Sequence, residues 1–265
     1  MRVPETGPVP LEEALADHTA VVFDLDGVLV DSNELKVDCV RDALAVFGPE
    51  LVDPFVDEFR RTFGRTRREH FLAFHRDYLG GRGTGRDEDF EPFYARYAGD
   101  YAALLGERYA KAPLCAHADR LVPALAARGV PLYVATGTLT PEAERLLGWH
   151  GLLDAFRGVL GGEEPKARRL SGVVARTGAA PHRTVLLGDS RQDLLAAGAA
   201  GTAFVLVTGY GFFPPGEILG GPGGPAGKEV AVAAGLDPRG LVTGAVVAQG
   251  PGQAGPVNAE PRTAP

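Results

Sequence analysis

The chain has 265 residues, a formal net charge of −7 at pH 7 and 45% hydrophobic residues. This apolar fraction is enough for a hydrophobic core, so the composition excludes wholesale disorder. The mildly negative charge argues against nucleic acid as the main partner. The length allows one large domain, or a core with an inserted module.

Glycine and proline are abundant, but they are unevenly distributed along the chain. The 36 Gly and 21 Pro make up about 22% of the residues, where an average domain has about 12%. In residues 214–265 their share rises to about 40%. We therefore expect 214–265 to be a poorly ordered tail without chemistry, in which an apolar stretch at 241–248 could add an edge strand.

The N-terminus and the cysteines are typical of a cytoplasmic protein. The segment from Met1 to Glu5 lacks the apolar core of a signal peptide, and no apolar run approaches the roughly 20 residues of a membrane span. Cys39 and Cys115 are too few for a disulfide framework, so we expect two reduced, buried thiols. We expect no membrane contact, and the sequence leaves the oligomeric state open.

The first predicted strand is followed by a long helical insertion. Residues 1–18 are expected to be a polar, Pro-rich lead-in, and 19–23 form an apolar run typical of a buried parallel strand. Apolar residues then recur at helical spacing, which predicts helices from Ser32 to Phe47, near 53–62, at 66–79 and at 89–110. No strand pattern is evident from 33 to 112, so we expect this segment to be an all-helical domain.

Strands and helices alternate in the next part of the chain. Strands are expected at 131–135, 156–160, 184–188 and 203–207. Helices are expected between them at 117–128, 141–149, 166–177 and 191–200. Such alternation predicts an α/β fold with a doubly wound, Rossmann-like parallel sheet, formed by residues 1–32 and 113–213.

Polar residues follow the predicted strands at the points where the strands end. They are Asp24 and Asp26, Thr136 and Gly137, Asp189 and Asp193, together with Lys166 at the start of a helix. Because the carboxyl ends of parallel strands meet at one edge of a sheet, we expect these residues to converge there.

This set of residues suits the transfer of a phosphoryl group. Converging carboxylates repel one another unless a cation lies among them, and a small number of hard oxygen ligands suits Mg²⁺, which also shares the phosphate of a substrate. A hydroxyl group, the free amides of Gly137 and Thr138 at a helix start, and an ammonium group would hold an anion. The set therefore predicts a metal-assisted site with a carboxylate nucleophile.

Two of these segments have distinctive patterns, which are Asp24-Leu25-Asp26-Gly27-Val28-Leu29-Val30-Asp31-Ser32 and Gly188-Asp189-Ser190-Arg191-Gln192-Asp193. With the Thr and Lys segments, and in this order, they resemble the four motifs of the haloacid dehalogenase superfamily over roughly residues 19–210. The helical insertion resembles the helical cap of phosphoglycolate phosphatase-like and β-phosphoglucomutase-like members. The third motif departs from the usual Lys-Pro, because the order here is Pro165-Lys166 with Ala167 next.

The resemblance implies a catalytic pair. Asp24 would attack phosphorus and form an aspartyl-phosphate. Asp26 would protonate the leaving oxygen and then take a proton from the water that hydrolyses this intermediate. Lys166 would keep Asp24 ionised, because a nearby cation lowers a carboxylate pKa.

The resemblance also implies a metal site and a phosphate site. Mg²⁺ would bind the Asp24 carboxylate, the Asp26 backbone carbonyl and Asp189, while Asp193 would support the metal's waters or Lys166. The phosphoryl oxygens would be held by Thr136, Gly137 and Lys166.

Substrate contacts from the insertion are expected at three residues. The chain has few Asn and Lys, yet Asn33 and Lys36 lie together beside the first motif, so we predict that one of them contacts the substrate; chance placement stays open. Arg65 could reach the substrate's non-reacting end, or belong to a solvated helix face. Asp31 and Ser32 are expected to cap a helix. Packed or solvated side chains are expected at His70, His75 and His150.

The sequence therefore predicts a Mg²⁺-dependent phosphatase for a small phosphorylated metabolite, a sugar or organic-acid phosphate. A phosphomutase with the same nucleophile stays open as an alternative. A non-catalytic binding protein on this fold is less expected, because Asp24, Asp26 and Asp189 are all present. A dehalogenase is disfavoured because dehalogenases lack an equivalent of Asp26.

Overall fold

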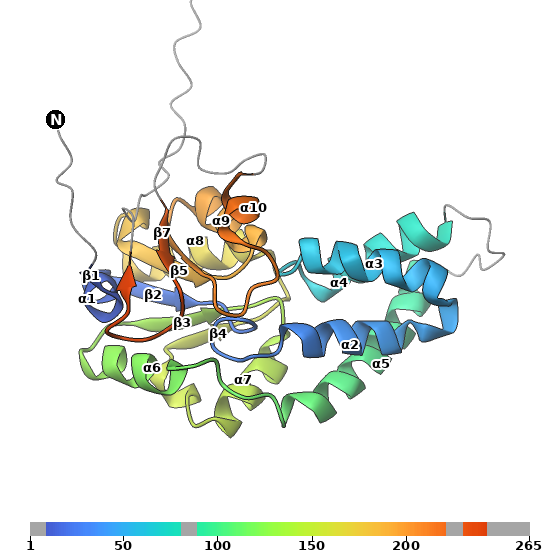
Figure 1. Ribbon diagram of the computed structural model, residues 1–265, viewed down its shortest axis with the longest axis horizontal. Coiled ribbons are helices and arrows are strands. Elements are labelled where there is room, and N and C mark those ends of the chain that lie inside the picture. Colours follow the sequence, from blue (N-terminus) through green and yellow to red (C-terminus); the bar gives the residue numbers. More distant parts are fainter. Residues whose placement is uncertain (1–8, 81–88, 221–229, 243–265) are drawn as a thin grey trace, which may run out of the picture.

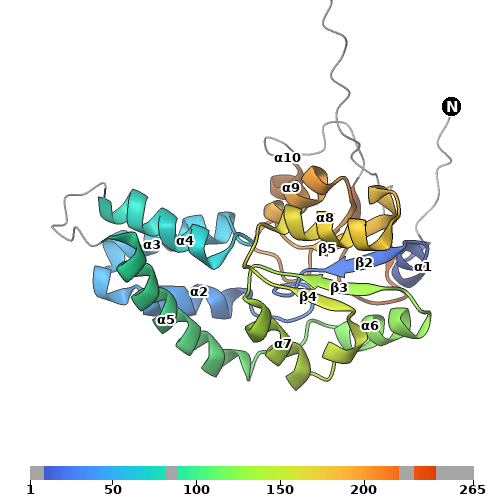
Figure 2. The ribbon, with the colours of Figure 1, turned by 180° about the vertical axis from the view of Figure 1, so that it is seen from behind.

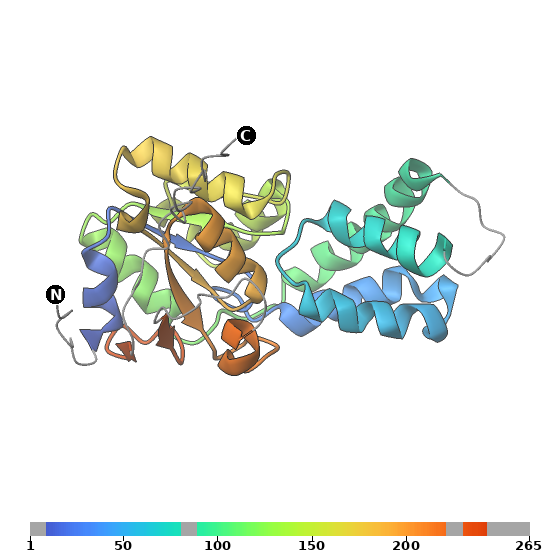
Figure 3. The same cartoon turned by 90° about the horizontal axis from the view of Figure 1, so that it is seen from above.

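The computed structural model describes residues 9–80, 89–220 and 230–242. Figure 1 shows a sheet with helices on both faces and, beside it, a group of helices from the early part of the chain. The view from behind shows the same two parts (Figure 2). Seen from above, the helical group lies beyond one end of the sheet (Figure 3). The chain therefore folds as a core with an inserted helical part.

The core sheet has six parallel strands among the described residues. They are β2 (Ala20–Phe23), β3 (Leu132–Ala135), β4 (Gly158–Leu160), β5 (Thr184–Gly188), β6 (Ala203–Val207) and β7 (Ala231–Ala233). Their order is β4-β3-β2-β5-β6-β7. Every residue of β2, β3, β5 and β6 is buried, as expected for a parallel sheet that is covered on both faces. The predicted α/β class with a doubly wound parallel sheet is confirmed.

Helices cover both faces of this sheet (Figure 1). The core helices and short helical turns are α1 (Leu11–Ala16), α6 (Ala118–Ala127), α7 (Thr140–Trp149), η4 (Leu153–Ala155), α8 (Lys166–Thr177), η5 (Pro181–Arg183), α9 (Arg191–Ala200) and α10 (Pro215–Gly220). Side chains alternate along β2, so that Val21 and Phe23 pack in one apolar cluster with α6 and α7, and Val22 packs in another with α8 and α9.

The inserted helical part, which we call the cap, consists of α2 (Asn33–Ala43), η1 (Ala45–Phe47), α3 (Pro49–Arg61), α4 (Arg67–Ala73), the π-helical turn η2 (Phe74–Leu79) and α5 (Phe90–Tyr109). Its interior is rich in aromatic rings. The ring centroids of Phe55 and Phe74 are 4.9 Å apart, as are those of Phe93 and Tyr97. Such contacts add to the free energy of burial, so the cap has an apolar core of its own.

Two cap helices differ from the expected ranges. The helix expected near 53–62 begins at Pro49, because proline suits the first turn of a helix, and it continues through Pro54. Burial of its apolar face outweighs the low helix propensity of Pro54. The helix expected at 66–79 changes at Phe74 into the π-helical turn.

Both ends of the chain contain structure where none was expected. Residues 11–16 of the predicted lead-in form α1, whose Leu11 and Leu15 are buried. In the predicted tail, α10 and β7 are formed, and β8 (Leu241–Val242) pairs antiparallel with β1 (Val9–Pro10). The expectation of a poorly ordered tail is therefore wrong for α10 and β7, whose apolar runs are too short to stand out in a Gly/Pro-rich sequence, whereas β8 lies in the stretch at 241–248 that was expected to add an edge strand. Residues 221–229 and 243–265, including most of the predicted edge strand, lie outside the described residues.

No helix in the described part of the chain is both long and apolar enough to cross a membrane.

Candidate active site

The loop after β2 carries Asp24 and Asp26 to the edge of the sheet that faces the cap. Both carboxylates are buried. The loop turns at Gly27, whose φ of 76° favours glycine. A Cβ atom at Gly27 would lie 2.2 Å from Asp189 Oδ2. The lack of a side chain at Gly27 therefore allows the loop to approach the end of β5 closely.

Asp24 lies next to the ammonium group of Lys166, the first residue of α8. Lys166 Nζ is 2.9 Å from Asp24 Oδ1 and also forms an ion pair with Asp193. The Leu25 amide donates a 2.8 Å hydrogen bond to Asp24 Oδ1. Burial raises the pKa of Asp24 to about 7, although the charge of Lys166 opposes this rise. The lysine therefore favours the ionised form of a carboxylate that burial penalises.

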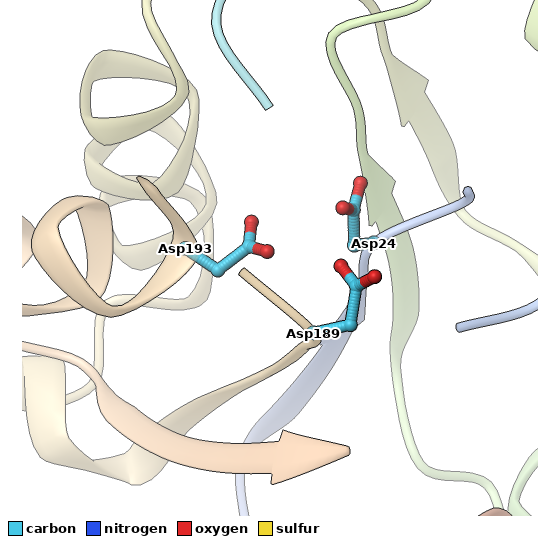
Figure 4. Close-up of side chains that lie close together, drawn as sticks. All are labelled: Asp24, Asp189 and Asp193. Atoms are coloured by element: carbon cyan, nitrogen blue, oxygen red, sulfur yellow. The ribbon is translucent and has the colours of Figure 1, made fainter. Parts of the chain in front are cut away.

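Three buried carboxylates, Asp24, Asp189 and Asp193, point toward a common space (Figure 4), and one oxygen of each lies within 4.8 Å of the others. Burial raises the pKa of Asp189, and the charges of Asp193 and Asp24 add to this rise. Among the described residues, no donor contacts the buried Oδ1 of Asp189. A cation would relieve both the repulsion and the missing contact, so a divalent metal ion fits this cluster.

Asp193 differs from the other two carboxylates because both of its oxygens are engaged. Oδ2 accepts hydrogen bonds from the Ser190 amide (3.1 Å) and hydroxyl (2.6 Å), and Oδ1 accepts from Lys166. The Ser190 hydroxyl in turn caps α9 by accepting from the Asp193 amide. This geometry leaves Asp24 and Asp189 as the more available metal ligands.

Asp26 is held by four close donors. Oδ1 accepts from Tyr109 Oη (2.6 Å) and Ser32 Oγ (2.7 Å), and Oδ2 accepts from Lys36 Nζ (2.8 Å) and Thr138 Oγ1 (3.0 Å). Burial alone would raise the pKa of Asp26. The charge of Lys36 and the hydrogen bonds from Lys36, Tyr109 and Ser32 outweigh burial and hold the pKa below its ordinary value.

The loop after β3 carries Thr136, Gly137 and Thr138 into contact with the cap. The Thr138 amide donates to Thr136 Oγ1 at 3.1 Å, and Thr136 Oγ1 lies 3.4 Å from Asp26 Oδ2. A Cβ atom at Gly137 would lie only 2.7 Å from the carbonyl oxygen of Arg65. Glycine at this position therefore allows the cap backbone to come down onto the loop.

The cap residues expected to contact the substrate are close to the carboxylates. Asn33 Nδ2 donates to Asp189 Oδ2 at 2.7 Å and to the Tyr210 carbonyl at 3.0 Å. Lys36 bridges Asp26 and the Thr138 hydroxyl group, the latter at 2.9 Å. Whether either residue contacts the substrate stays a prediction.

Ser32 corrects one expectation. It stands at the N-cap position of α2, yet its side chain makes no capping hydrogen bond and donates instead to Asp26 and to the Val30 carbonyl. The short loop between β2 and α2 folds back on itself, which brings Ser32 to Asp26.

Three other residues near the site were not expected from the sequence. Tyr109, at the end of α5, has no sequence signal, because only the cap fold brings it to Asp26. Arg169 Nη1 donates to the carbonyls of Thr136 and Leu160 (the latter at 2.9 Å), and its spacing from Lys166 on α8 is the one available clue. Arg67 forms a buried ion pair with Glu142 on α7.

A cavity lies between the core carboxylates and the cap. It is lined by Asp24, Asp26, Gly137 and Thr138 from the core and by Lys36, Phe59, Phe63, Gly64, Arg65, Arg67, His70, Phe71 and Tyr101 from the cap. Its volume of about 20 Å³ is enough for about one water molecule. The free space beside the carboxylates is therefore too small for a phosphorylated substrate, so binding would require the cap or its side chains to move.

The parallel sheet, the inserted cap and the enclosed carboxylates define an α/β enzyme with a capped site. Residues 18–201 match the sequence model of haloacid dehalogenase-like hydrolases, and the chain belongs to this family. It is 32% identical over 203 residues to a phosphoglycolate phosphatase of Rhodospirillum rubrum, an alignment that covers 73% of this chain and 80% of the relative. The predicted family and the assignment as a phosphatase enzyme are confirmed.

Solved structures support the fold. A predicted phosphoglycolate phosphatase from Haemophilus somnus has a TM-score of 0.61 and 22% identity, covering 76% of this chain and 91% of that one. A β-phosphoglucomutase from Clostridium difficile has a TM-score of 0.59 and 17% identity, covering 73% and 86%. At these identities the likeness concerns the fold alone.

Proposed function

We propose that the chain is a Mg²⁺-dependent phosphatase that hydrolyses a small phosphorylated metabolite through an aspartyl-phosphate on Asp24. The contact between Lys166 and the buried Asp24, within a cluster of carboxylates, is the observation that carries this proposal. In this proposal the core domain consists of residues 1–32 and 113–213 and carries the catalytic residues. The cap domain consists of residues 33–112 and covers the site. A cytoplasmic location stays a prediction.

Asp24 would act as the nucleophile. Its oxygen would form a bond to phosphorus while the bond from phosphorus to the leaving oxygen breaks. The ammonium group of Lys166 supports this role in two ways, because it favours the ionised carboxylate and would balance charge on the phosphoryl oxygens. Thr136 and Gly137, which end the neighbouring strand, would provide a hydroxyl and an amide to the same oxygens.

Asp26 would move the protons. In the first half of the reaction it would give a proton to the leaving oxygen, and in the second half it would take one from the attacking water. The donors around Asp26 hold it ionised in this structure, which favours its role as the base of the second half; to act as the acid of the first half it would have to gain a proton before the leaving oxygen departs. Tyr109 and Ser32, each within 2.7 Å, would fix its orientation.

Asp24 and Asp189, with the backbone carbonyl of Asp26, would hold Mg²⁺. When bound, this ion would stabilise the negative charge of the phosphoryl group. Asn33 supports the site by donating to Asp189, and Asp193 supports it by holding Lys166. Of Asn33 and Lys36, one of which is predicted to contact the substrate, we favour Lys36 because it lines the cavity. Arg65, the third candidate, also lines the cavity.

Phosphate release from acetyl phosphate, with Mg²⁺ or with a chelator, tests the proposal. We expect Asp24→Asn to lower kcat by at least about 1,000-fold, because the amide is a poor nucleophile, and the chelator to abolish turnover. Asp100→Asn, at an exposed position of α5, is the matched control and should retain full activity. Full activity of Asp24→Asn would exclude the mechanism.

A phosphomutase remains the alternative, since it would use the same nucleophile and return the phosphoryl group to a sugar. Product analysis with a hexose 1-phosphate distinguishes the two. Free phosphate supports the phosphatase, whereas an isomerised sugar phosphate supports the mutase.

A further inference from the structure

The cap side of the cavity is mainly aromatic. Phe59, Phe63, Phe71 and Tyr101 line it, and each is at most 4% exposed. The rings of Phe59 and Phe63 are 5.6 Å apart and those of Phe71 and Tyr101 are 6.0 Å apart. These rings line the same cavity as Asp24 and Asp26, so the alcohol that leaves phosphorus during attack by Asp24 would project toward them.

Two of the charged groups of the cap wall are engaged with other residues, and a third polar side chain is neutral. Lys36 Nζ bonds Asp26 and Thr138, and Arg67 is paired with Glu142. The His70 ring packs 4.4 Å from that of Phe59, and burial lowers the pKa of His70 to about 3, so it adds no charge at neutral pH. The aromatic rings of the wall cannot replace the hydrogen bonds to water that the hydroxyl groups of a sugar would lose on entering, and Arg65 and the hydroxyl group of Tyr101 are the other polar groups that the wall offers.

One polar group of the cap wall, the Nε of Arg67, has no hydrogen-bond partner among the described residues. The Arg67 side chain is 7% exposed and its guanidinium lies 4.8 Å from the centroid of the Tyr101 ring. Its Nε is buried and donates no hydrogen bond to any of the described residues. An unpaired buried donor is costly, so an acceptor on a bound molecule would satisfy it.

We propose that the cap selects phosphate monoesters whose alcohol has a compact apolar body and a single acceptor group for Arg67, in preference to sugar phosphates. This inference rests on the proposed phosphatase function and narrows its substrate class. Phe59, Phe63 and Phe71 contact the apolar body, and Arg67 binds the acceptor, for which a carboxylate is the best match in charge.

Four alkyl phosphates with unactivated leaving groups test the proposal on the full-length protein with Mg²⁺. They are the phosphate ester of 2-hydroxy-3-methylbutanoate, isobutyl phosphate, 2-phosphoglycolate and glucose 6-phosphate. We expect kcat/KM for the first ester, which has both features, to exceed that for isobutyl phosphate and for 2-phosphoglycolate at least tenfold. Glucose 6-phosphate should be at least 100-fold poorer. A kcat/KM for glucose 6-phosphate within threefold of that for the first ester would overturn the proposal.

Two variants assign the features to residues. Arg67→Gln should bring kcat/KM for the first ester within threefold of that for isobutyl phosphate. Phe59→Leu should bring kcat/KM for the first ester within threefold of that for 2-phosphoglycolate. Phe55→Leu, the same change at a buried ring of the cap that does not line the cavity, should preserve the ranking. If a variant does not fold, the kcat/KM values of the wild-type protein for the four esters still test the proposal. If the protein hydrolyses acetyl phosphate in an Asp24-dependent way but ranks the four esters differently, this inference alone is overturned. If it does not hydrolyse acetyl phosphate, the proposed function is overturned as well.

Discussion

Lys166 lies between two buried acids, Asp24 and Asp193, and is itself buried. Each partner raises the pKa of Lys166, and their charges outweigh the effect of burial. An isolated ammonium group in this position would be unstable, and so would either carboxylate without it. The arrangement is therefore cooperative, and removal of the lysine affects both acids.

Lys166→Met should lower kcat on acetyl phosphate by at least about 100-fold at pH 7, because the pKa of Asp24 would rise further and the charge beside the phosphoryl group would be lost. Steady-state kinetics with Mg²⁺ measure the effect. Lys111→Met, at an exposed lysine, is the matched control. Activity of Lys166→Met within threefold of wild type would exclude the proposed role.

His70 makes stability depend on pH. Its pKa is lowered from 6.5 to about 3 in the folded state, so between these values the unfolded chain binds more protons and stability falls as pH falls. Between pH 6.5 and 5 this amounts to about 2 kcal/mol. Between these pH values the free energy of unfolding of His70→Leu, measured with urea, should therefore fall by about 2 kcal/mol less than that of wild type. Equal losses would contradict the prediction; His182→Leu, at an exposed position, is the control.

At the scale of elements, β7 shows that part of the Gly/Pro-rich tail belongs to the core. Ala231 and Ala233 are buried, and the Thr208 amide donates to the Ala233 carbonyl at 3.0 Å. The strand thus extends the sheet beyond β6 with side chains small enough to fit beneath neighbouring segments.

A charge at Ala231 should destabilise the whole protein. We expect Ala231→Asp to lower the free energy of unfolding by about 3 kcal/mol, because it buries a carboxylate without a partner. Ala234→Asp, an exposed position just after the strand, should change it by less than about 0.5 kcal/mol. Urea unfolding compares the two, and equal effects would show that β7 does not pack in solution.

Most of the elements follow from local sequence, because apolar runs and helical spacing are local properties. The predicted strands agree closely with β2, β3, β5 and β6. The helix α1 and strand β7 were missed since each is short and depends on tertiary burial. The π-helical turn at Phe74 was missed as well, because the helical spacing of the apolar residues continues through it.

At the scale of the whole molecule, the cap and core meet through backbone contact at Gly137 and the ion pair between Arg67 and Glu142. These contacts enclose a cavity of about 20 Å³ beside Asp24. A cap that opens to admit a substrate and closes over it would exclude bulk water while leaving room for the one water molecule that hydrolyses the intermediate.

Enclosure should limit the size of the substrate. We expect kcat/KM for a phosphoserine peptide of ten residues to be at least 100-fold below that for isobutyl phosphate, which has a leaving group of similar reactivity, because the cap cannot close over a peptide chain. Phosphate release measures both rates. Comparable rates would show that catalysis does not require the closed structure.

The sequence by itself determined the fold class and brought forward Asp24, Asp26, Thr136, Lys166 and Asp189, because motifs at strand ends are local and parallel strands align their carboxyl ends at one edge. Tertiary structure decided the partners of these residues. Tyr109 reaches Asp26 only through the packing of α5, and Arg67 reaches Glu142 through the packing of the cap on the core. Contacts between segments far apart in the chain depend on how whole helices pack, and no local pattern encodes that packing.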